Sequence, residues 1–210
     1  MQLPKELKNI YGYDGSGWHP ARIDASTHTI QTIEYEHHEI HGGNSYTAYY
    51  TRTTAGTSGH RSGIYIRTPL VKEIHMIVSF SASVAADFSI CEGITIDVNE
   101  GTNGVAIYNR DRNSSKTSGI RDNATAQTVN KFTTFDETAL GNANFSAGTV
   151  LRTSPLSVGT GPKAAGGADR GGQEYILKRD TKYLFLITNT VATANVHHVL
   201  IDWYEHTNRS

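Results

Sequence analysis

The chain has 210 residues, enough for one large β domain or two small ones that bury most of their apolar surface without disulfide staples. Its 19 Lys and Arg residues against 20 Asp and Glu residues give a formal net charge of −1 without a long basic run, so we expect no nucleic-acid partner. The single cysteine, Cys91, excludes an intrachain disulfide and a zinc site built from cysteines, and we expect its thiol to be buried.

The N-terminal segment predicts little regular structure. Residues 3–10 can form one helical turn with Pro4 in its first position, but the glycine-rich stretch that follows ends it. The segment has no charged-then-apolar export signal, and no stretch of the chain approaches the roughly 20 apolar residues of a membrane span. We therefore expect synthesis in a cytoplasm, no membrane partner, an N-terminal arm over residues 1–18 and a single domain over residues 19–210.

Four segments in the first half show the composition of strands. Apolar residues alternate with polar ones over residues 74–80 and 94–98, which places the apolar members on one face of each strand. Residues 45–51 and 64–67 are rich in β-branched and aromatic side chains, and residues 54–59 (TAGTSG) between them read as a turn. These two segments therefore predict a hairpin.

Two apolar runs near the C-terminal end predict central strands. Residues 183–187 and 196–204 are apolar at both alternating positions, as in strands buried on two faces. None of the five prolines falls inside the predicted strands, as ladder hydrogen bonding requires. Many short alternating strands with little helix predict two packed sheets, so we expect an all-β, antiparallel β-sandwich that is jelly-roll-like.

Residues 109–172 differ from the rest in composition. Ser, Thr, Asn, Gly and Ala dominate, and apolar residues are isolated, so the stretch predicts a long irregular loop excursion with a glycine-rich hinge at residues 159–172. Such a loop is unusual in a compact domain unless it binds something. We expect it to become ordered against a neighbouring subunit; a mobile surface loop is the alternative.

The densest polar cluster lies at residues 34–41 (EYEHHEIH). On a strand, His37, Glu39 and His41 share one face, and two imidazoles with a carboxylate suit a divalent metal ion. Since each step of two residues along a strand spans about 7 Å, convergence on one ion needs a sharp bulge. We therefore expect a hydrogen-bonded network between strands or subunits, with a metal site as the alternative, and we expect no cofactor.

Hydrolase and nucleotide-binding signals are missing. Ser, His and Asp are plentiful, but no Gly-x-Ser-x-Gly motif occurs. The glycine-rich residues 12–17 and 159–163 lack the Gly-Lys-Ser/Thr ending of a phosphate-binding loop. We expect no enzymatic activity.

Large aromatic side chains are candidates for contact with a partner. Trp18, Trp203 and Tyr204, together with other tyrosines, could line a sugar-binding groove. Such residues are more often core or interface anchors, which is the interpretation we favour.

A charged triplet follows the apolar residues 105–108. In it the guanidinium groups of Arg110 and Arg112 flank the carboxylate of Asp111 where the long loop begins. Arginines in such a place can form bidentate pairs across an interface. A solvated cluster of loop charges is the alternative.

Four motifs carry a family resemblance: residues 35–41 (YEHHEIH), 108–115 (YNRDRNSS), 175–178 (YILK) and 203–206 (WYEH). In order and spacing along nearly the whole chain they resemble a family of virion structural proteins of tailed bacteriophages. The resemblance implies a structural component of the particle without assigned enzymatic activity or catalytic residues. At the positions of Asn109 to Arg112, relatives more often have the sequence Asn-Arg-Asn-Arg, so this chain differs from them at Asp111.

Among virion roles, the resemblance and the chain length fit best a capsid decoration, or cement, protein. Such a protein is a small β-sandwich on the outer capsid surface, commonly a homotrimer, and its partners are the major capsid protein and copies of itself. Binding that occurs only on the assembled shell stabilises the shell by mass action. We expect the long loop and residues 1–18 to contact neighbouring subunits. The alternative function is a host-recognition module on a head or tail fibre that binds surface glycans through exposed aromatic side chains.

Overall fold

The computed structural model describes residues 11–13, 17–20, 35–55, 58–95, 104–121, 132–136, 148–156, 169–170 and 174–207. The chain divides into two compact units, Met1–His38 and Glu39–Ser210. In the first unit, β1 (Tyr11–Tyr13) pairs antiparallel with β2 (Trp18–Pro20). The helical turn expected at residues 3–10 lies outside the described residues, as does most of the expected arm.

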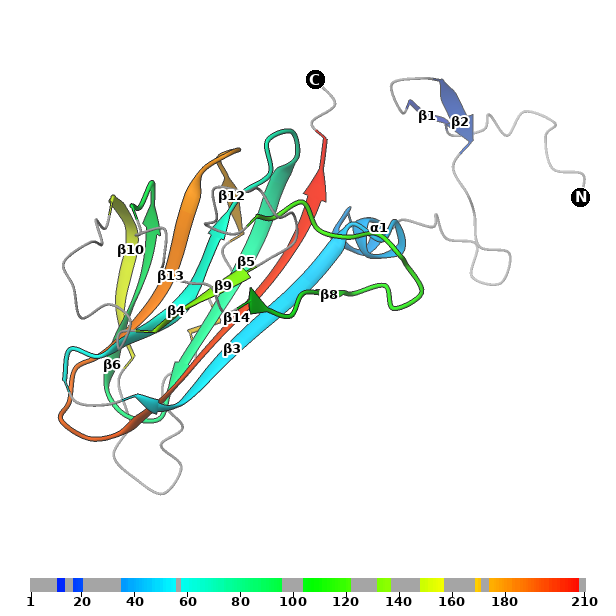
Figure 1. Cartoon of the computed structure of the whole chain (residues 1–210). Coiled ribbons are helices and arrows are strands. Elements are labelled where there is room, and N and C mark those ends of the chain that lie inside the picture. The colour runs from blue at the N-terminus through cyan, green and yellow to red at the C-terminus, as the bar shows by residue number, and fades with distance from the viewer. Residues whose placement is uncertain are drawn as a thin grey trace, which may run out of the picture. The chain divides into compact units, whose positions relative to one another are not determined.

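Two antiparallel sheets form the body of the second unit, and their buried faces share one hydrophobic core (Figure 1). One sheet contains β3 (Ser45–Ala55), β5 (Glu73–Ala82), β8 (Tyr108–Asn109), β11 (Asp169–Arg170), β12 (Tyr175–Leu177) and β14 (Asn195–His206). The other contains β4 (Arg61–Arg67), β6 (Ala86–Glu92), β7 (Gly104–Val105), β9 (Phe132–Asp136), β10 (Thr149–Leu156) and β13 (Lys182–Asn189). The predicted all-β sandwich is therefore confirmed.

The strand order is nested. The first sheet runs β11-β5-β14-β3-β8, with β12 also paired to β5, and the second runs β10-β6-β13-β4-β9-β7. Thus β3 pairs with the last strand, β14, while β4 pairs with β13, β5 with β12 and β6 with β10. In this order a long antiparallel pair of chain segments is divided between two sheets. The finer expectation of a jelly-roll-like topology stays a prediction.

Alternating burial explains why the expected strand at residues 74–80 forms. Every second side chain of β5 is buried, and Phe80 of this strand stacks on Phe88 of β6 across the core with ring centroids 4.3 Å apart. Such aromatic pairs contribute about 0.5–1.5 kcal/mol beyond the area that they bury. The apolar residues that recur at every second position in this segment therefore form the buried face of the strand.

The two C-terminal strands are central, as predicted, but they differ in burial. Strand β13 lies between β6 and β4, and its residues Tyr183 to Ile187 are all buried. Its second face packs Leu184 and Leu186 with Cys91 in a smaller apolar cluster, so the expected burial of that thiol is confirmed. Strand β14 lies between β5 and β3, and from Asn195 to Trp203 only every second residue is buried, so two-sided burial is wrong for most of this strand. Tyr204 and Glu205 near its end are both buried.

Two expectations about connections are wrong. Strands β3 and β4 do not form a hairpin, because β3 pairs with β14 and β8 in one sheet while β4 pairs with β13 and β9 in the other. Residues 109–172 are not irregular throughout, since they contain β9, β10 and β11. Pro155 lies in β10, an edge strand, where the missing backbone N–H is tolerated. Of the expected strand at 94–98, residues 96–98 lie outside the described residues.

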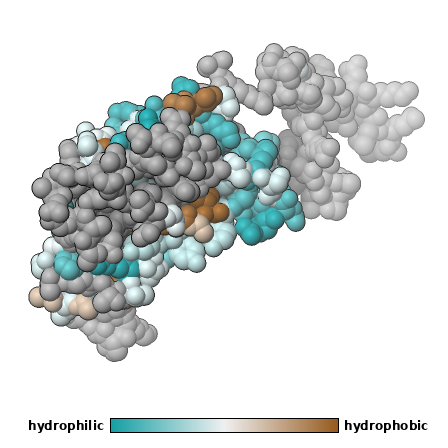
Figure 2. All heavy atoms as spheres, viewed as in Figure 1, coloured by the Kyte–Doolittle hydropathy of each residue, from teal (hydrophilic) through white to brown (hydrophobic). Residues whose placement is uncertain are grey.

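The described surface is mainly polar on the face seen in Figure 2, where hydrophobic residues form small separate patches. The exposed large hydrophobic side chains among the described residues are Tyr49, Leu70, Val71, Tyr108, Val150, Leu151, Ile176 and Val196. No helix in the described part of the chain has the length and apolar character needed to cross a membrane.

A buried histidine, His197, lies near the start of β14. Its Nδ1 atom is 2.6 Å from the hydroxyl of Ser62, and its Nε2 atom has no hydrogen-bond partner among the described residues. Burial, and after it the positive charge of Arg52, lower the pKa of His197 to about 4. The folded protein therefore keeps this ring neutral at a pH where the unfolded chain protonates it.

We expect the protein to lose stability between pH 6.5 and pH 4, because in this range the unfolded chain gains a proton that folded His197 excludes. The loss from this group between pH 7 and pH 5 is about 2 kcal/mol. Urea unfolding at both pH values measures it. In the variant His197→Gln, the free energy of unfolding should depend less on pH than in the wild type. The control His38→Gln, at an exposed position, should show the same pH dependence as the wild type. Equal slopes for His197→Gln and wild type would contradict this assignment.

Candidate functional site

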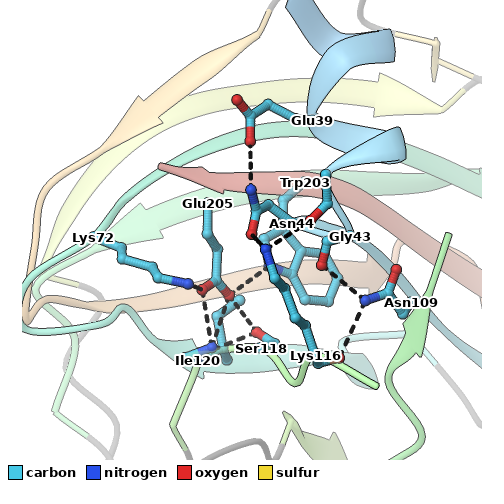
Figure 3. A network of polar contacts seen from close by, with 12 residues as sticks. Glu39, Gly43, Asn44, Lys72, Asn109, Lys116, Ser118, Ile120, Trp203 and Glu205 are labelled. Carbon is cyan, nitrogen blue, oxygen red and sulfur yellow. Dashed lines mark hydrogen bonds and ion pairs between the residues drawn. The ribbon is translucent and has the colours of Figure 1, made fainter. Parts of the chain in front are cut away.

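A buried carboxylate near the end of β14 holds the segment that follows β8, residues 110–121, which we call the clasped loop (Figure 3). The Glu205 side chain has no exposed surface. The Ser118 hydroxyl donates to its Oε1 at 2.5 Å, and the backbone N–H of Gly119 donates to both oxygens at 2.8 and 3.0 Å. The Trp203 indole N–H at 3.3 Å and the Lys72 ammonium group at 3.4 Å complete the set. A buried charge is tolerated only with such compensation.

The start of the clasped loop is fixed to the turn between α1 (Tyr35–His41) and β3. The Asn109 side-chain amide donates to the Gly43 carbonyl at 2.9 Å, and Lys116 Nζ donates to the Gly42 carbonyl at 2.7 Å. Gly43 has a φ of 68°, and a Cβ atom there would lie 2.2 Å from the Ser114 hydroxyl oxygen. The close approach of loop and turn thus requires glycine at this position.

The far end of the clasped loop is held by Arg121. Its backbone forms an antiparallel bridge with Arg67, and its guanidinium donates to the Thr68 carbonyl at 3.0 Å and to Asp180. Although partial burial opposes the shift, hydrogen bonds from Arg121 and Arg67 lower the pKa of Asp180 below its usual range. Both ends of the loop are therefore bonded to the sandwich.

The tip of the clasped loop is a self-bonded turn. The Asn109 side-chain oxygen accepts from the Asp111 N–H at 2.9 Å, and the Asp111 carboxylate accepts from the Asn113 N–H at 3.0 Å. The Asp111 carboxylate therefore caps the turn from within, as short polar side chains commonly do. Arg110 and Arg112 are exposed on either side of it, and the Arg112 guanidinium lies 5.7 Å from the centre of the Tyr108 ring.

Two exposed tyrosines lie near this tip on the outer face of the sheet. Tyr108 is 41% exposed and pairs with Thr47 of β3, and Tyr49, two residues farther along β3, is 53% exposed. Residues two apart on a strand share a face, so both rings are on the solvent side. Tyr49 also lies 6.1 Å from the His198 ring.

Two of the other aromatic candidates, Trp203 and Tyr204, are buried. Trp203 is 1% exposed and stacks on Tyr46 at 5.6 Å, so of the two expected roles, core or interface anchor, it has the core role and is not available to a partner. Tyr204 is 9% exposed, and its hydroxyl lies 3.0 Å from His75 Nδ1. The side chain of Trp18 lies outside the described residues, so its expected role stays a prediction.

A small pocket of about 210 Å³ separates the clasped loop from β3. Its lining includes Tyr46, Ile107 and Lys116. The Tyr46 hydroxyl is buried without a hydrogen-bond partner among the described residues, and burial, with a smaller effect of Glu205, raises the pKa of Tyr46 to about 12. The pocket therefore adjoins a neutral phenol.

Residues 35–41 of the polar cluster form helix α1, so the strand geometry assumed for its metal site is wrong. Residues two apart on a helix point to nearly opposite sides. Glu39 is buried and accepts a hydrogen bond from the Asn44 amide at 2.9 Å, whereas His37 and His41 are exposed. The described residues do contain one group with metal-ligand spacing, and it lies elsewhere: Glu73, His75 and His206.

No family model matches this chain, and comparison with curated proteins and with solved structures finds no match either. The family resemblance therefore stays an expectation from the sequence. Two of the motifs behind it contact the same loop: residues 108–115 comprise β8 and the tip of the clasped loop, and residues 203–206 include Glu205, which holds the loop at Ser118 and Gly119.

We expect Ser118→Ala to lower the free energy of unfolding by about 1.5–3 kcal/mol, the range for a hydrogen bond to a charged group. The substitution removes the hydroxyl that donates to buried Glu205 and accepts from the Ile120 N–H. Urea unfolding gives the stability, and hydrogen exchange of the Gly119 amide reports on the loop itself. Ser115→Ala, at an exposed position of the same loop, is the matched control. Identical urea midpoints for the two variants would show that Glu205 does not hold the loop.

Proposed function

We propose that this chain is a structural component of a bacteriophage particle, a capsid decoration protein that binds the outer shell and stabilises it. The family resemblance of its motifs supports this function, and so does the construction of the clasped loop. One observation carries the proposal: residues 108–115, one of the motifs behind the resemblance, include a turn that is bonded to the sandwich and displays two exposed arginines.

A turn of this kind suits binding to a protein surface. Its backbone is already ordered by the hydrogen bonds of Asn109 and Asp111, so binding loses little conformational entropy. Guanidinium groups form bidentate hydrogen bonds with carboxylates, which makes acidic side chains of the major capsid protein the natural partners of Arg110 and Arg112. The Asp111 carboxylate accepts a hydrogen bond inside the turn. Both arginines are exposed, although Arg110 also donates to the Ser45 hydroxyl at 3.4 Å and Arg112 lies over the Tyr108 ring.

The energetics of a shell favour such contacts. A protein that binds the assembled lattice and not its free subunits stabilises the lattice by an amount that grows with concentration and affinity. Each site repeats over the shell, so a modest contact at each copy suffices. In this proposal the protein is a homotrimer, and residues 1–18 contact neighbouring copies.

We expect Arg110→Ala/Arg112→Ala to weaken binding to undecorated particles by about 30-fold or more, the loss typical of a central arginine contact. Co-sedimentation of purified protein with particles that lack it measures the affinity. Lys178→Ala/Arg179→Ala is the matched control, since it removes two exposed positive charges elsewhere and changes the net charge equally. An equal loss of affinity in both variants would show that the effect comes from net charge alone. An unchanged affinity in the arginine variant would refute the docking role of the turn.

Recognition of a host glycan is the second candidate function. The observation that favours it is the pair of exposed tyrosines, Tyr49 and Tyr108, on one face of neighbouring strands. Aromatic rings with one apolar face and a polar edge suit stacking on sugars.

Under the decoration proposal, we expect no saturable binding of this protein to host-surface polysaccharide. Isothermal titration calorimetry of the wild-type protein with purified polysaccharide measures whether such binding occurs. Saturable binding that disappears in Tyr49→Ala/Tyr108→Ala and persists in Leu70→Ala, a substitution at another exposed apolar residue, would favour the glycan function instead.

A further inference from the structure

Three ionisable side chains converge on the outer face of the sheet that contains β5 and β14. Glu73 and His75 belong to β5, and His206 is the last residue of β14, where it pairs with Glu73 in the strand register. One ligand atom from each of the three lies within 4.8 Å of the other two. The two strands run side by side in Figure 1. The register of the pair therefore brings together residues that are far apart in sequence.

The two imidazoles face each other through nitrogen atoms that can bind a metal. His75 Nε2 lies 2.7 Å from His206 Nε2. On its other side, His75 Nδ1 lies 3.1 Å from a carboxylate oxygen of Glu174 and 3.0 Å from the Tyr204 hydroxyl. A carboxylate on one nitrogen fixes the proton there and leaves the opposite nitrogen as a lone pair, the arrangement found behind metal-binding histidines.

We propose that Glu73, His75 and His206 bind a divalent transition-metal ion of the zinc class. Zinc-to-nitrogen bonds are 2.0–2.1 Å, so two nitrogens on one tetrahedral ion lie about 3.3 Å apart. The two Nε2 atoms, which are 2.7 Å apart, need to separate by about 0.6 Å to admit the ion. Two histidines and one glutamate are a known three-residue zinc set, with a fourth position for water.

The carboxylate of Glu73 is available as the third ligand. The Arg179 guanidinium lies 3.9 Å from its Oε1 atom, a loose ion pair in which both groups are partly exposed. That contact is weak in water, and it leaves the second carboxylate oxygen for the ion. The imidazole nitrogens favour zinc, nickel, copper or cobalt, whereas magnesium and calcium require oxygen ligands.

The ion would act on the strand that holds the clasped loop. Tyr204 and His206 lie on the outer face of β14, and Glu205 between them points inward to Ser118. An ion bridging His206 to β5 fixes the end of β14 and so supports Glu205 from the opposite face. This role is structural and does not depend on the proposed decoration function.

The test is isothermal titration calorimetry of the untagged protein with Zn²⁺. Titration with Mg²⁺ is the negative control. We expect one Zn²⁺ per chain, a rise in melting temperature with Zn²⁺ and visible absorption of a tetrahedral Co²⁺ complex. His75→Asn/His206→Asn should abolish binding, and Glu174→Gln should weaken it by about 10- to 100-fold by removing the partner of His75.

The helical histidines provide the matched control. His37 and His41 are exposed and one helical turn apart, a spacing that also attracts transition metals, so His37→Ala/His41→Ala should leave the Zn²⁺ affinity unchanged. Absence of saturable Zn²⁺ binding in the wild type would overturn the proposal. So would loss of binding in the helical variant together with wild-type affinity in Glu174→Gln, a substitution at an exposed position that the fold tolerates.

Discussion

The buried carboxylate of Glu205 is the contact on which the candidate site depends. It lies on the inward side of β14, where a charge without donors would be costly. Ser118 and Gly119 supply those donors from the clasped loop, which explains how a polar segment holds one conformation against the sandwich. The tip is placed separately, by the hydrogen bonds of Asn109 to the Gly43 carbonyl and to the Asp111 N–H. The loop that carries the two exposed arginines is thus held by Asn109 on one side and by Glu205 on the other.

The sandwich makes that contact possible because β14 is central. Its inward face contributes Val199, Ile201 and Trp203 to the core, while its outward face carries Tyr204 and His206. Between β5 and β3 the strand has ladder partners on both sides, so its side chains are held in fixed register. The clasped loop and the cluster of Glu73, His75 and His206 therefore lie on opposite faces of β14.

Much of the sheet structure could be predicted from the sequence, because burial on one face repeats every two residues, as in β5, and continuous burial marks β13. Partner choice could not, since it depends on pairing between distant segments: β3 joins β14 and not β4. The segment at residues 35–41 is polar on all sides, so its pattern does not distinguish strand from helix. The arginines of the site were predicted, but Glu205 was missed because Ser118 is 87 residues away from it. For Trp203 the sequence left open a core or an interface role, because residue type alone does not show on which face of a strand a side chain lies.

We propose that this sandwich docks on a shell through the turn at the tip of the clasped loop. High-resolution imaging of native particles that contain the protein is the decisive experiment. We expect density for the sandwich on the outer capsid surface, with residues 108–115 against acidic side chains of the major capsid protein. Density at the tail or on a fibre, with this turn pointing into solvent, would contradict it.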